Sequence, residues 1–475
     1  MPAETKNYDL VVIGGGPAGI MAGTVASNCG KKVAIVNNHK ELGGAGINTG
    51  TVPSKTLRET ALALSGLKSR NLYGVDLSVR RKVTVADFLG HEQHVRVGFN
   101  TFLSKRFQDN KTDVYEGTAS FVDAHTLSIP GALLGEETTG QDLLLRGENI
   151  LIATGSSPVQ PPLFPFGKGE IYDSDSILQL DQLPGTLAVI GAGVIGSEYG
   201  CTFAALGTKV HVIDGRDMLL PFLDKEVSKA LETAMQKASL EFHWKEKVVE
   251  CTIPETGAVL LKLSSGATMT VDAVLVAAGR KSNTDALNLV AAGVTTGERG
   301  IIAVDENYRT NVPHIYAAGD VIGFPALAST SMEQARRAVR HAFDLQASPL
   351  SPLLPNGIYT IPEVSMVGET EESAKKKGLD YVIGRASYGE SARGRIIGDT
   401  DGFVKLIFNR SDMKLLGIHI IGEQATDIIH IGLMVMLLDG TAEHFSEACF
   451  NTPTLGILYK TAALAAIRAA GIPVA

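Results

Sequence analysis

The sequence predicts an α/β protein with two Rossmann-like domains followed by a smaller α+β domain. Two segments indicate the Rossmann-like domains, because each reads as an apolar strand, a glycine-rich turn and a helix of small residues. These segments begin at Tyr8 and Leu187, far enough apart to lie in separate domains. A proline-rich stretch, Ser348–Pro355, then precedes a C-terminal region in which strand and helix patterns are mixed.

The first segment opens with the continuous apolar strand Tyr8–Ile13, as a buried parallel sheet requires. In a glycine turn of this type the first glycine makes the tight turn, the second lets a pyrophosphate approach, and the third lets helix and strand pack closely. A second strand, Lys32–Val36, follows the helix, and Asn37 replaces the acid that usually binds the ribose. The residues predicted to bind a dinucleotide here are Gly14, Gly16, Pro17, Ala18, Gly19 and Asn37.

The second segment repeats this pattern with the strands Leu187–Ile190 and Lys209–Ile213. Asp214 ends the second strand, where a carboxylate favours NAD and repels the 2′-phosphate of NADP. Arg216 lies two residues further on and would attract that phosphate, so the sequence leaves dual specificity open. The residues predicted to bind a nucleotide here are Gly191, Gly193, Val194, Ile195, Gly196, Asp214 and Arg216.

The rest of the chain predicts further elements in order. Asp87–Asn110 reads as a long amphipathic helix, Asp113–Tyr115 and Ser120–Ile129 alternate as a hairpin, and Asn149–Gly155 returns to a buried strand. After the second Rossmann-like domain we expect strands within Ile358–Glu369, Val404–Asn409 and Leu415–Ile421, and helices near Ile428–Leu438 and Leu455–Arg468.

Composition excludes several classes of protein. The net charge of the 475 residues is -8, so neither nucleic acid nor an anionic membrane is an expected partner. No apolar stretch is long enough for a membrane span, and Met1–Asn7 lacks the core of a signal peptide, which predicts a cytoplasmic protein. The cysteines lack metal or redox spacing, so we expect buried free thiols and no metal site; they are Cys29, Cys201, Cys251 and Cys449.

Three further motifs carry a resemblance to a known family. They are Ala153-Thr154-Gly155, Ala278-Gly279-Arg280 and Ile315-Tyr316-Ala317-Ala318-Gly319-Asp320. Together with the two glycine turns, they make the chain resemble the pyridine nucleotide–disulfide oxidoreductases over nearly its whole length. The resemblance implies FAD as cofactor, NAD(P)H as substrate and a homodimer. It also implies an FAD-binding domain in two parts, 1–155 and 279–347, an NAD(P)-binding domain at 156–278 and a dimerisation domain at 348–475.

The same resemblance implies roles for single residues. Lys55 matches the lysine at flavin N5 and Glu198 its ion-pair partner, so these two are the predicted catalytic residues. Asp320 would bind the ribityl–phosphate part of FAD. The loop Ala326, Leu327 and Ala328 would open a helix under the flavin. The other residues with an implied cofactor contact are Gly44, Thr49, Gly50, Ser54, Ala119, Ala153, Thr154, Gly155, Val248, Gly279, Arg280 and Gly319.

The departures from the disulfide-reducing members concern electron transfer. Dihydrolipoamide dehydrogenase and glutathione reductase carry two redox cysteines where this chain has Gly46 and Thr51. Their catalytic histidine and the glutamate that orients it correspond to Thr452 and Ile457. The soluble pyridine nucleotide transhydrogenases of the same family also lack a working disulfide. The chain resembles them in Gly50–Lys55, Arg216–Asp224 and Phe450–Thr454.

The sequence therefore predicts hydride transfer between NADPH and NAD through FAD, by a ping-pong scheme without a redox disulfide. An alternative is an NAD(P)H dehydrogenase of diaphorase or oxidase type, because replacing a cysteine with Gly46 leaves space where a quinone, a dye or oxygen could enter. A third is a flavin-binding dimer that has lost electron transfer. Asn37 lacks the charge of the usual acid, which indicates weaker retention of FAD.

Overall fold

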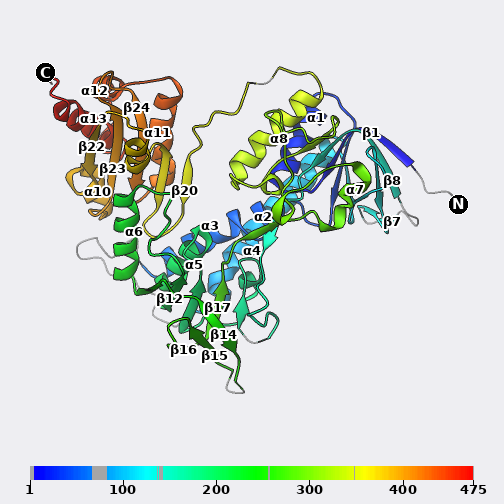
Figure 1. Cartoon of the computed structure of the whole chain (residues 1–475), viewed down its shortest axis with the longest axis horizontal. Helices are drawn as coiled ribbons and strands as arrows, with labels where there is room; N and C mark the ends of the chain where they lie inside the picture. The colour runs from blue at the N-terminus through cyan, green and yellow to red at the C-terminus, as the bar shows by residue number, and fades with distance from the viewer. Residues whose placement is uncertain are drawn as a thin grey trace. The chain divides into compact units, whose positions relative to one another are not determined.

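The computed structural model describes residues 5–66, 83–135, 137–138, 143–168, 170–254, 257–346 and 348–473 (Figure 1). By its internal contacts the chain divides into two compact units. Unit 1 comprises Met1–Thr56, Gly90–Val159 and Ala278–Ser351, and unit 2 comprises Leu57–Leu89, Gln160–Ala277 and Pro352–Ala475. None of the helices in the described ranges has both the length and the apolar character needed to cross a membrane.

Unit 1 is built on a sheet with a parallel centre. The strand β1 (Thr5–Ile13) lies between β2 (Val33–Asn37) and β8 (Leu143–Ile152) and is parallel to both. Alternate residues of β1 enter two different cores. Leu10 and Val12 pack with the helices α1 (Pro17–Asn28) and α8 (Ala328–Ala342), and Val11 and Ile13 pack on the opposite face.

The remaining strands of this sheet extend it on both sides. In the described part of the chain its order is β4-β5-β8-β1-β2-β3-β6-β7, with β19 beside β8. These strands are β3 (Asp113–Glu116), β4 (Ser120–Phe121), β5 (Thr126–Ile129), β6 (Leu133–Leu134), β7 (Glu137–Thr138) and β19 (Ile315–Ala317). Smaller elements of unit 1 are β9 (Ser156–Pro158), β18 (Arg280–Ser282), α7 (Leu289–Ala292) and the 3-10 helices Asp285–Leu287, Glu298–Gly300 and Asp320–Ile322.

The predicted hairpin is correct only in part. The strands β4 and β5 do pair antiparallel within Ser120–Ile129. The prediction that β3 belongs to this hairpin is wrong, because β3 pairs with β2 in parallel and with β6. The helices α2 (Gly44–Ile47), α3 (Thr51–Leu64) and α4 (Val85–Asp109) connect β2 to β3, and a helical crossover of this kind returns the chain to a parallel strand.

Unit 2 contains a second parallel sheet, ordered β10-β17-β11-β12-β13. Its strands are β10 (Ile171–Tyr172), β11 (Thr186–Ile190), β12 (Lys209–Asp214), β13 (Leu240–Trp244) and β17 (Ala273–Val276). One face packs on α5 (Val194–Ala205) and α6 (Lys225–Lys237). The other packs on an antiparallel sheet formed by β14 (Val248–Thr252), β15 (Val259–Leu263) and β16 (Thr268–Val271). A 3-10 helix, Ser176–Gln179, lies between β10 and β11.

The C-terminal part of unit 2 is an antiparallel sheet covered by helices, as an α+β domain requires. Its order is β20-β21-β24-β23-β22. The strands are β20 (Asn356–Ile358), β21 (Val364–Gly368), β22 (Tyr381–Ser387), β23 (Phe403–Asn409) and β24 (Leu415–Ile421). The helices are α9 (Glu371–Lys376), α10 (Ala392–Ile397), α11 (Ala425–Leu437), α12 (Ala442–Glu447), α13 (Ile457–Ala469) and the 3-10 turn Tyr388–Glu390.

The expectation of buried cysteines holds for one residue. Cys201 is buried on α5, and burial raises the pKa of its thiol to about 12. Cys251 is partly buried, whereas Cys29 and Cys449 are exposed, so the prediction is wrong for these two. Cys29 immediately follows the last residue of α1, a position at which a helix end meets solvent.

Candidate nucleotide-binding and active site

The first glycine turn joins β1 to α1 and has no room for side chains at two of its glycines. Gly14 has a φ of 109°, and a Cβ there would collide with the carbonyl oxygen of Ala153. A Cβ on Gly19 would collide with the carbonyl oxygen of Gly14. At Gly16, by contrast, the nearest neighbour of an added Cβ is the Cα of Gly44 at 3.9 Å. The turn therefore packs tightly against the sheet at Gly14 and Gly19 but leaves room for a ligand beside Gly16.

This open side has the features that a bound dinucleotide requires. Gly16 is the N-cap of α1, and no side chain in the described ranges caps that helix start. Its unpaired N–H groups can bind a pyrophosphate. Thr154, next to the turn, has a shielded Oγ1 without a hydrogen-bond partner among the described residues. A hydroxyl of this kind needs a partner, and a bound cofactor would supply one, so this site fits FAD.

The amide of Asn37 fastens the turn to the loop that follows β2. Its Oδ1 accepts the N–H of Gly15 at 3.0 Å. Its Nδ2 donates to the carbonyl oxygens of His39 at 2.7 Å and Glu41 at 3.0 Å. Both amide hydrogens are therefore used within the protein, and a ribose hydroxyl would find only the remaining acceptor capacity of Oδ1.

Replacing Asn37 with aspartate should destabilise this loop by about 1–3 kcal/mol, although it restores the acid that is usual at this position. The carboxylate has no hydrogen to donate and would face the carbonyl oxygens of His39 and Glu41. We expect a lower melting temperature and faster loss of FAD, measured by thermal denaturation with flavin fluorescence. Asn38→Asp, at the exposed neighbouring residue, is the matched control. Tighter FAD binding in Asn37→Asp would show that the ribose contact outweighs the loop contacts.

Asp320 is held by residues from two other segments of unit 1. Ser156 Oγ donates to Asp320 Oδ2 at 2.8 Å, and Arg280 Nε donates to Ser156 Oγ at 2.8 Å. Gly319 has a φ of 80° and donates its N–H to Oε1 of Gln334 on α8 at 2.9 Å. Sequence reasoning missed Ser156 and Gln334. The position of Ser156 directly after Ala153-Thr154-Gly155 was the available signal.

The predicted helix after Ala326-Leu327 is confirmed as α8, which begins at Ala328. Thr330 Oγ1 donates to the carbonyl oxygen of Leu327 at 2.9 Å, and Ser331 Oγ donates to the same oxygen at 2.9 Å. These hydroxyls bond backward along the chain, so no described side chain caps the start of α8. Its N–H groups can therefore stabilise negative charge.

The second glycine turn, in unit 2, repeats the geometry of the first. Gly191 has a φ of 107°, and a Cβ there would lie 2.7 Å from the carbonyl oxygen of Ala277. A Cβ on Gly196 would collide with the carbonyl oxygen of Gly191, whereas one on Gly193 would meet no atom within 4 Å. Ala192 donates its N–H to Asp214 Oδ2 at 2.7 Å, as Gly15 does to Asn37. The same hydrogen bond thus joins turn and second strand in both units.

Asp214 and Arg216 form a tight pair beside this turn. Arg216 donates to Asp214 Oδ1 from Nε at 2.9 Å and to Oδ2 from its guanidinium at 2.6 Å. Burial opposes ionisation of Asp214, but these bonds and the N–H of Ala192 outweigh it and lower the pKa of the carboxyl to about 2. Asp214 is therefore ionised at neutral pH. The guanidinium, with its side chain 45% exposed, can reach either this carboxylate or a phosphate.

The two predicted catalytic residues lie on helices of different units. Lys55, on α3, donates from Nζ to Ser54 Oγ at 3.2 Å. Glu198, buried on α5, accepts the N–H of Tyr359 at 2.9 Å. Sequence reasoning missed Tyr359, because nothing local to it indicates a partner on α5. The pairing of Lys55 with Glu198 stays a prediction.

The segment that carries cysteines in the disulfide-reducing relatives packs on the first glycine turn. A Cβ on Gly44 would lie 2.8 Å from the Cα of Gly16, and one on Gly46 would lie 2.6 Å from Cγ of Pro17. Thr51 is exposed at the start of α3. Gly50 donates its N–H to the carbonyl oxygen of Ala45 at 2.7 Å, which closes the turn between α2 and α3. No thiol stands at either redox position.

The structure thus gathers the predicted residues into two groups. In unit 1, contacts join Gly14 to Ala153, Gly15 to Asn37 and Gly16 to Gly44. In unit 2, they join the second glycine turn to Asp214 and Arg216. Ala119 and Val248 are buried in units 1 and 2, respectively. The cofactor contacts of all the predicted residues, including these two, Thr49 and Ser54, remain predictions.

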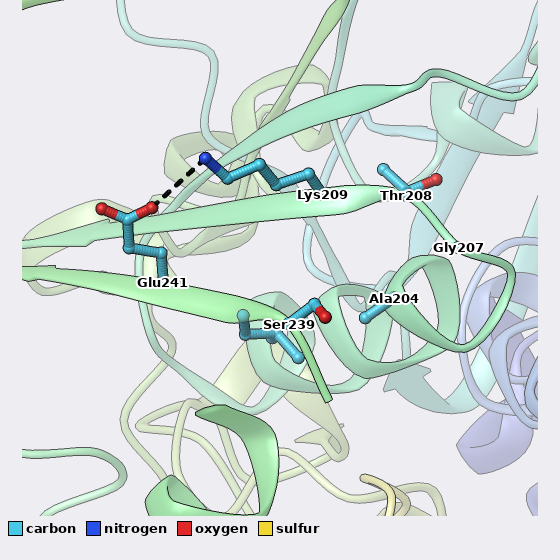
Figure 2. A pocket seen from close by; sticks show the side chains of 7 residues that line it. Ala204, Gly207, Thr208, Lys209, Ser239 and Glu241 are labelled. Carbon is cyan, nitrogen blue, oxygen red and sulfur yellow. Dashed lines mark ion pairs between the residues drawn. The ribbon is translucent and has the colours of Figure 1, made fainter. Parts of the chain in front are cut away.

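A hollow of about 400 Å³ in unit 2 is not part of either group (Figure 2). It lies at the amino ends of β12 and β13, whereas nucleotides bind at the carboxyl ends of parallel strands. Its lining residues are Ala204, Gly207, Thr208, Lys209, Ser239, Leu240 and Glu241. It therefore plays no part in the nucleotide site.

Known proteins are similar to this chain in sequence and in fold. The soluble pyridine nucleotide transhydrogenase of Mycobacterium bovis (strain BCG / Pasteur 1173P2) is 44% identical over 459 residues, which cover 97% of each chain. The protein of the same name from Hahella chejuensis is 39% identical over 461 residues, 96% of this chain and 97% of that one.

Solved structures and family models agree with this similarity. The HOCl-induced flavoprotein disulfide reductase RclA from Escherichia coli has a TM-score of 0.86 and 26% identity, over 96% of this chain and 99% of that one. LpdA from Mycobacterium tuberculosis, at 24% identity, shares the fold, with a TM-score of 0.88 over 96% of this chain and 99% of that one. A model described as pyridine nucleotide-disulphide oxidoreductase matches residues 8–342, and one described as the dimerisation domain of these enzymes matches residues 354–463. The chain therefore belongs to the pyridine nucleotide-disulphide oxidoreductase family, and it is an FAD-dependent enzyme with NAD(P)H as substrate.

Proposed function

We propose that this enzyme transfers hydride between NADPH and NAD and that it does so without a redox disulfide. The observation that carries the proposal is the turn between α2 and α3, where Gly46 and Thr51 stand at the positions of the redox cysteines. Both glycine turns keep their nucleotide-binding geometry. The name of the relatives at 44% and 39% identity supports the same reaction.

Bound FAD would supply hydride chemistry, taking a hydride from one nucleotide and returning it to another. The chain supplies positions and charges for this reaction. The open starts of α1 and α8 would hold anionic groups, and Asp214 and Arg216, which pair beside the second glycine turn, would contact the adenosine ribose of the exchanging nucleotide. Lys55 and Glu198 are proposed to steady charge at the reacting ring. One nucleotide site used in succession by donor and acceptor gives the ping-pong order.

The proposal is tested by anaerobic steady-state assays with NADPH as donor and either a thio analogue of NAD or a quinone as acceptor. Transfer to the analogue, with parallel lines in double-reciprocal plots, is the expected result. Turnover with the quinone alone would reject it. Titration with NADPH should reduce the protein with about one equivalent of donor per FAD, since a redox disulfide would accept two further electrons and consume a second equivalent.

The structure removes the steric reason for the alternative function, an NAD(P)H dehydrogenase that passes electrons to a quinone, a dye or oxygen. That alternative relied on space left by the missing side chain at Gly46. A Cβ there would already lie 2.6 Å from the ring of Pro17, so α2 packs against the glycine turn and leaves no room at Gly46. The quinone arm of the assay still measures this activity directly.

Arg216→Ala should raise the Michaelis constant for NADPH by about tenfold and change the constant for NADH much less. The guanidinium forms charge-assisted bonds to its partner, and each such bond contributes about 1.5–3 kcal/mol. Only NADPH offers a 2′-phosphate in place of the Asp214 carboxylate. Lys245→Ala, which removes an exposed cation paired with Asp217 in the same region, is the control. Equal changes for both nucleotides would show that Arg216 does not bind the 2′-phosphate.

We also infer that two chains assemble through the dimerisation domain at residues 354–463. Thr452, which replaces the catalytic histidine of disulfide-reducing relatives, is exposed and lies in this domain. Light scattering of the FAD-loaded protein should give twice the 50.2 kDa mass of one chain.

A further inference from the structure

Two neighbouring strands of unit 2 bring together three side chains that are ligands for metal ions in many proteins. His211 lies on β12, and Glu241 and His243 lie on the edge strand β13. The parallel register places His211 beside Glu241 and Ile213 beside His243. Residues two apart on a strand share a face, so all three side chains project from the same side of the sheet.

The ligand atoms lie close enough to share one ion. Nδ1 of His211 is 3.1 Å from Nε2 of His243 and 3.5 Å from Oε2 of Glu241. Nε2 of His243 is 3.8 Å from Oε1 of Glu241. A tetrahedral zinc ion with bonds of about 2.0–2.1 Å places its ligand atoms roughly 3.3 Å apart. The three separations bracket that value, and the two to Glu241 end on different oxygens of its carboxylate, so a rotation of that side chain brings one oxygen to both imidazoles.

The surroundings also suit a cation. The side chains of His211 and His243 are 13% and 21% exposed, whereas that of Glu241 is 53% exposed, so an ion can enter past the carboxylate. The competing cation is Lys209, whose Nζ lies 3.6 Å from Glu241 Oε2 (Figure 2). An exposed ion pair at this distance is weak, so a divalent ion would displace Lys209 from the Glu241 carboxylate.

We propose that His211, Glu241 and His243 form a binding site for a divalent transition-metal ion such as Zn²⁺, with water completing the coordination. Two imidazoles and one carboxylate are a ligand set that Zn²⁺ accepts, whereas Mg²⁺ and Ca²⁺ prefer oxygen ligands. The sequence predicts no metal site, because His211 lies far along the chain from Glu241 and His243. Only strand pairing brings them together.

A bound ion would also brace the residues proposed to select the nucleotide. The chain continues from His243 into a loop in which Lys245 donates its N–H to the carbonyl oxygen of Arg216 at 2.9 Å. Glu246 donates its N–H to the carbonyl oxygen of Asp214 at 3.2 Å. The ion would join β12 to β13 just before these contacts, so occupancy should raise the melting temperature of the protein.

The test uses tag-free, FAD-loaded protein that has been treated with a chelator. Titration with Zn²⁺ against a chromophoric competitor should show one equivalent bound per chain, and Co²⁺ should give the visible spectrum of a tetrahedral complex. His243→Gln and His211→Gln should each weaken Zn²⁺ binding at least about 100-fold, since loss of an outer-shell partner alone costs 10–100-fold. His94→Gln, at an exposed histidine of α4, should bind Zn²⁺ like the wild type.

Two results would overturn the proposal. One is failure of the wild type to bind Zn²⁺ at the protein concentration used. The other is undiminished binding by the His211→Gln/His243→Gln double variant. Circular dichroism spectra recorded in the presence of chelator check that each variant is folded. If His211→Gln does not fold, His243→Gln, at the sheet edge, is still expected to fold normally. Transhydrogenase activity is a separate measurement, so neither result bears on the proposed function.

Discussion

Lys405→Met should lower the free energy of unfolding by about 3–5 kcal/mol, the loss expected when one partner of a buried ion cluster is removed. The Lys405 side chain is 2% exposed, and its ammonium lies 2.9 Å from Asp224, 3.0 Å from Glu371 and 3.2 Å from Glu226. Asp224 is itself 1% exposed and starts α6 by accepting the N–H of Glu226 at 3.1 Å. Methionine fills the space but leaves this carboxylate buried without its cation.

Urea denaturation at neutral pH measures the effect, and Lys375→Met is the control. Lys375 binds the same Glu371 but is 63% exposed, so its loss should cost less than about 1 kcal/mol. Equal losses in the free energy of unfolding for the two substitutions would show that burial of the Lys405 cluster adds nothing to stability.

The same cluster predicts a dependence on pH. Burial raises the pKa of Asp224, but Lys405 and neighbouring groups outweigh it, so the pKa is lower in the folded state. This contribution to stability is present above the unfolded pKa of about 3.9 and is lost as pH falls below it. In Lys405→Met, burial alone would raise the pKa of Asp224 in the folded state, so protonation relieves the buried charge. The difference between variant and wild type should therefore shrink between pH 7 and pH 4.

Gly196→Val should slow reduction of the bound flavin by NADPH by about 100-fold or more while FAD stays in place, because small misplacements of reacting groups have effects of this size. A side chain at this residue would collide with the carbonyl oxygen of Gly191 and push α5 away from the second glycine turn. Gly19→Val makes the corresponding collision with Gly14 in unit 1 and should lose FAD instead. Anaerobic stopped-flow absorbance and the flavin content of the purified proteins separate the two effects.

Gly98→Val is the matched control, because a Cβ on this glycine of α4 meets no atom within 4 Å. It should retain both FAD and the wild-type rate. Loss of FAD from Gly196→Val, or unchanged reduction by NADPH, would contradict the assignment of the second glycine turn to the exchanging nucleotide.

The features that could be predicted from sequence are those fixed by local chemistry. Gly14 and Gly191 adopt positive φ angles, and each follows an apolar strand end, Leu10–Ile13 or Leu187–Ile190, so both turns and their order were predictable. The helix start at Ala328 follows a local signal of the same kind.

The features that were missed depend on pairing between distant segments. The partner of β3 is decided by a crossover through α4, which the alternation of Asp113–Tyr115 does not reveal. Ser156 and Gln334 matter only because they meet Asp320 and Gly319. His211 and His243 become neighbours only through the register of β12 and β13.

Each glycine turn donates an equivalent hydrogen bond to the end of the second strand, and the two bonds differ in the charge of the acceptor. In unit 1 the acceptor is a neutral amide whose hydrogens are already used, and in unit 2 it is a carboxylate paired with Arg216. Added salt screens the exposed guanidinium of Arg216, which would meet a phosphate, whereas the amide of Asn37 has no charge to screen. High ionic strength should therefore weaken binding of the exchanging nucleotide NADPH while FAD stays bound. Turnover should then fall although the protein keeps its flavin absorbance.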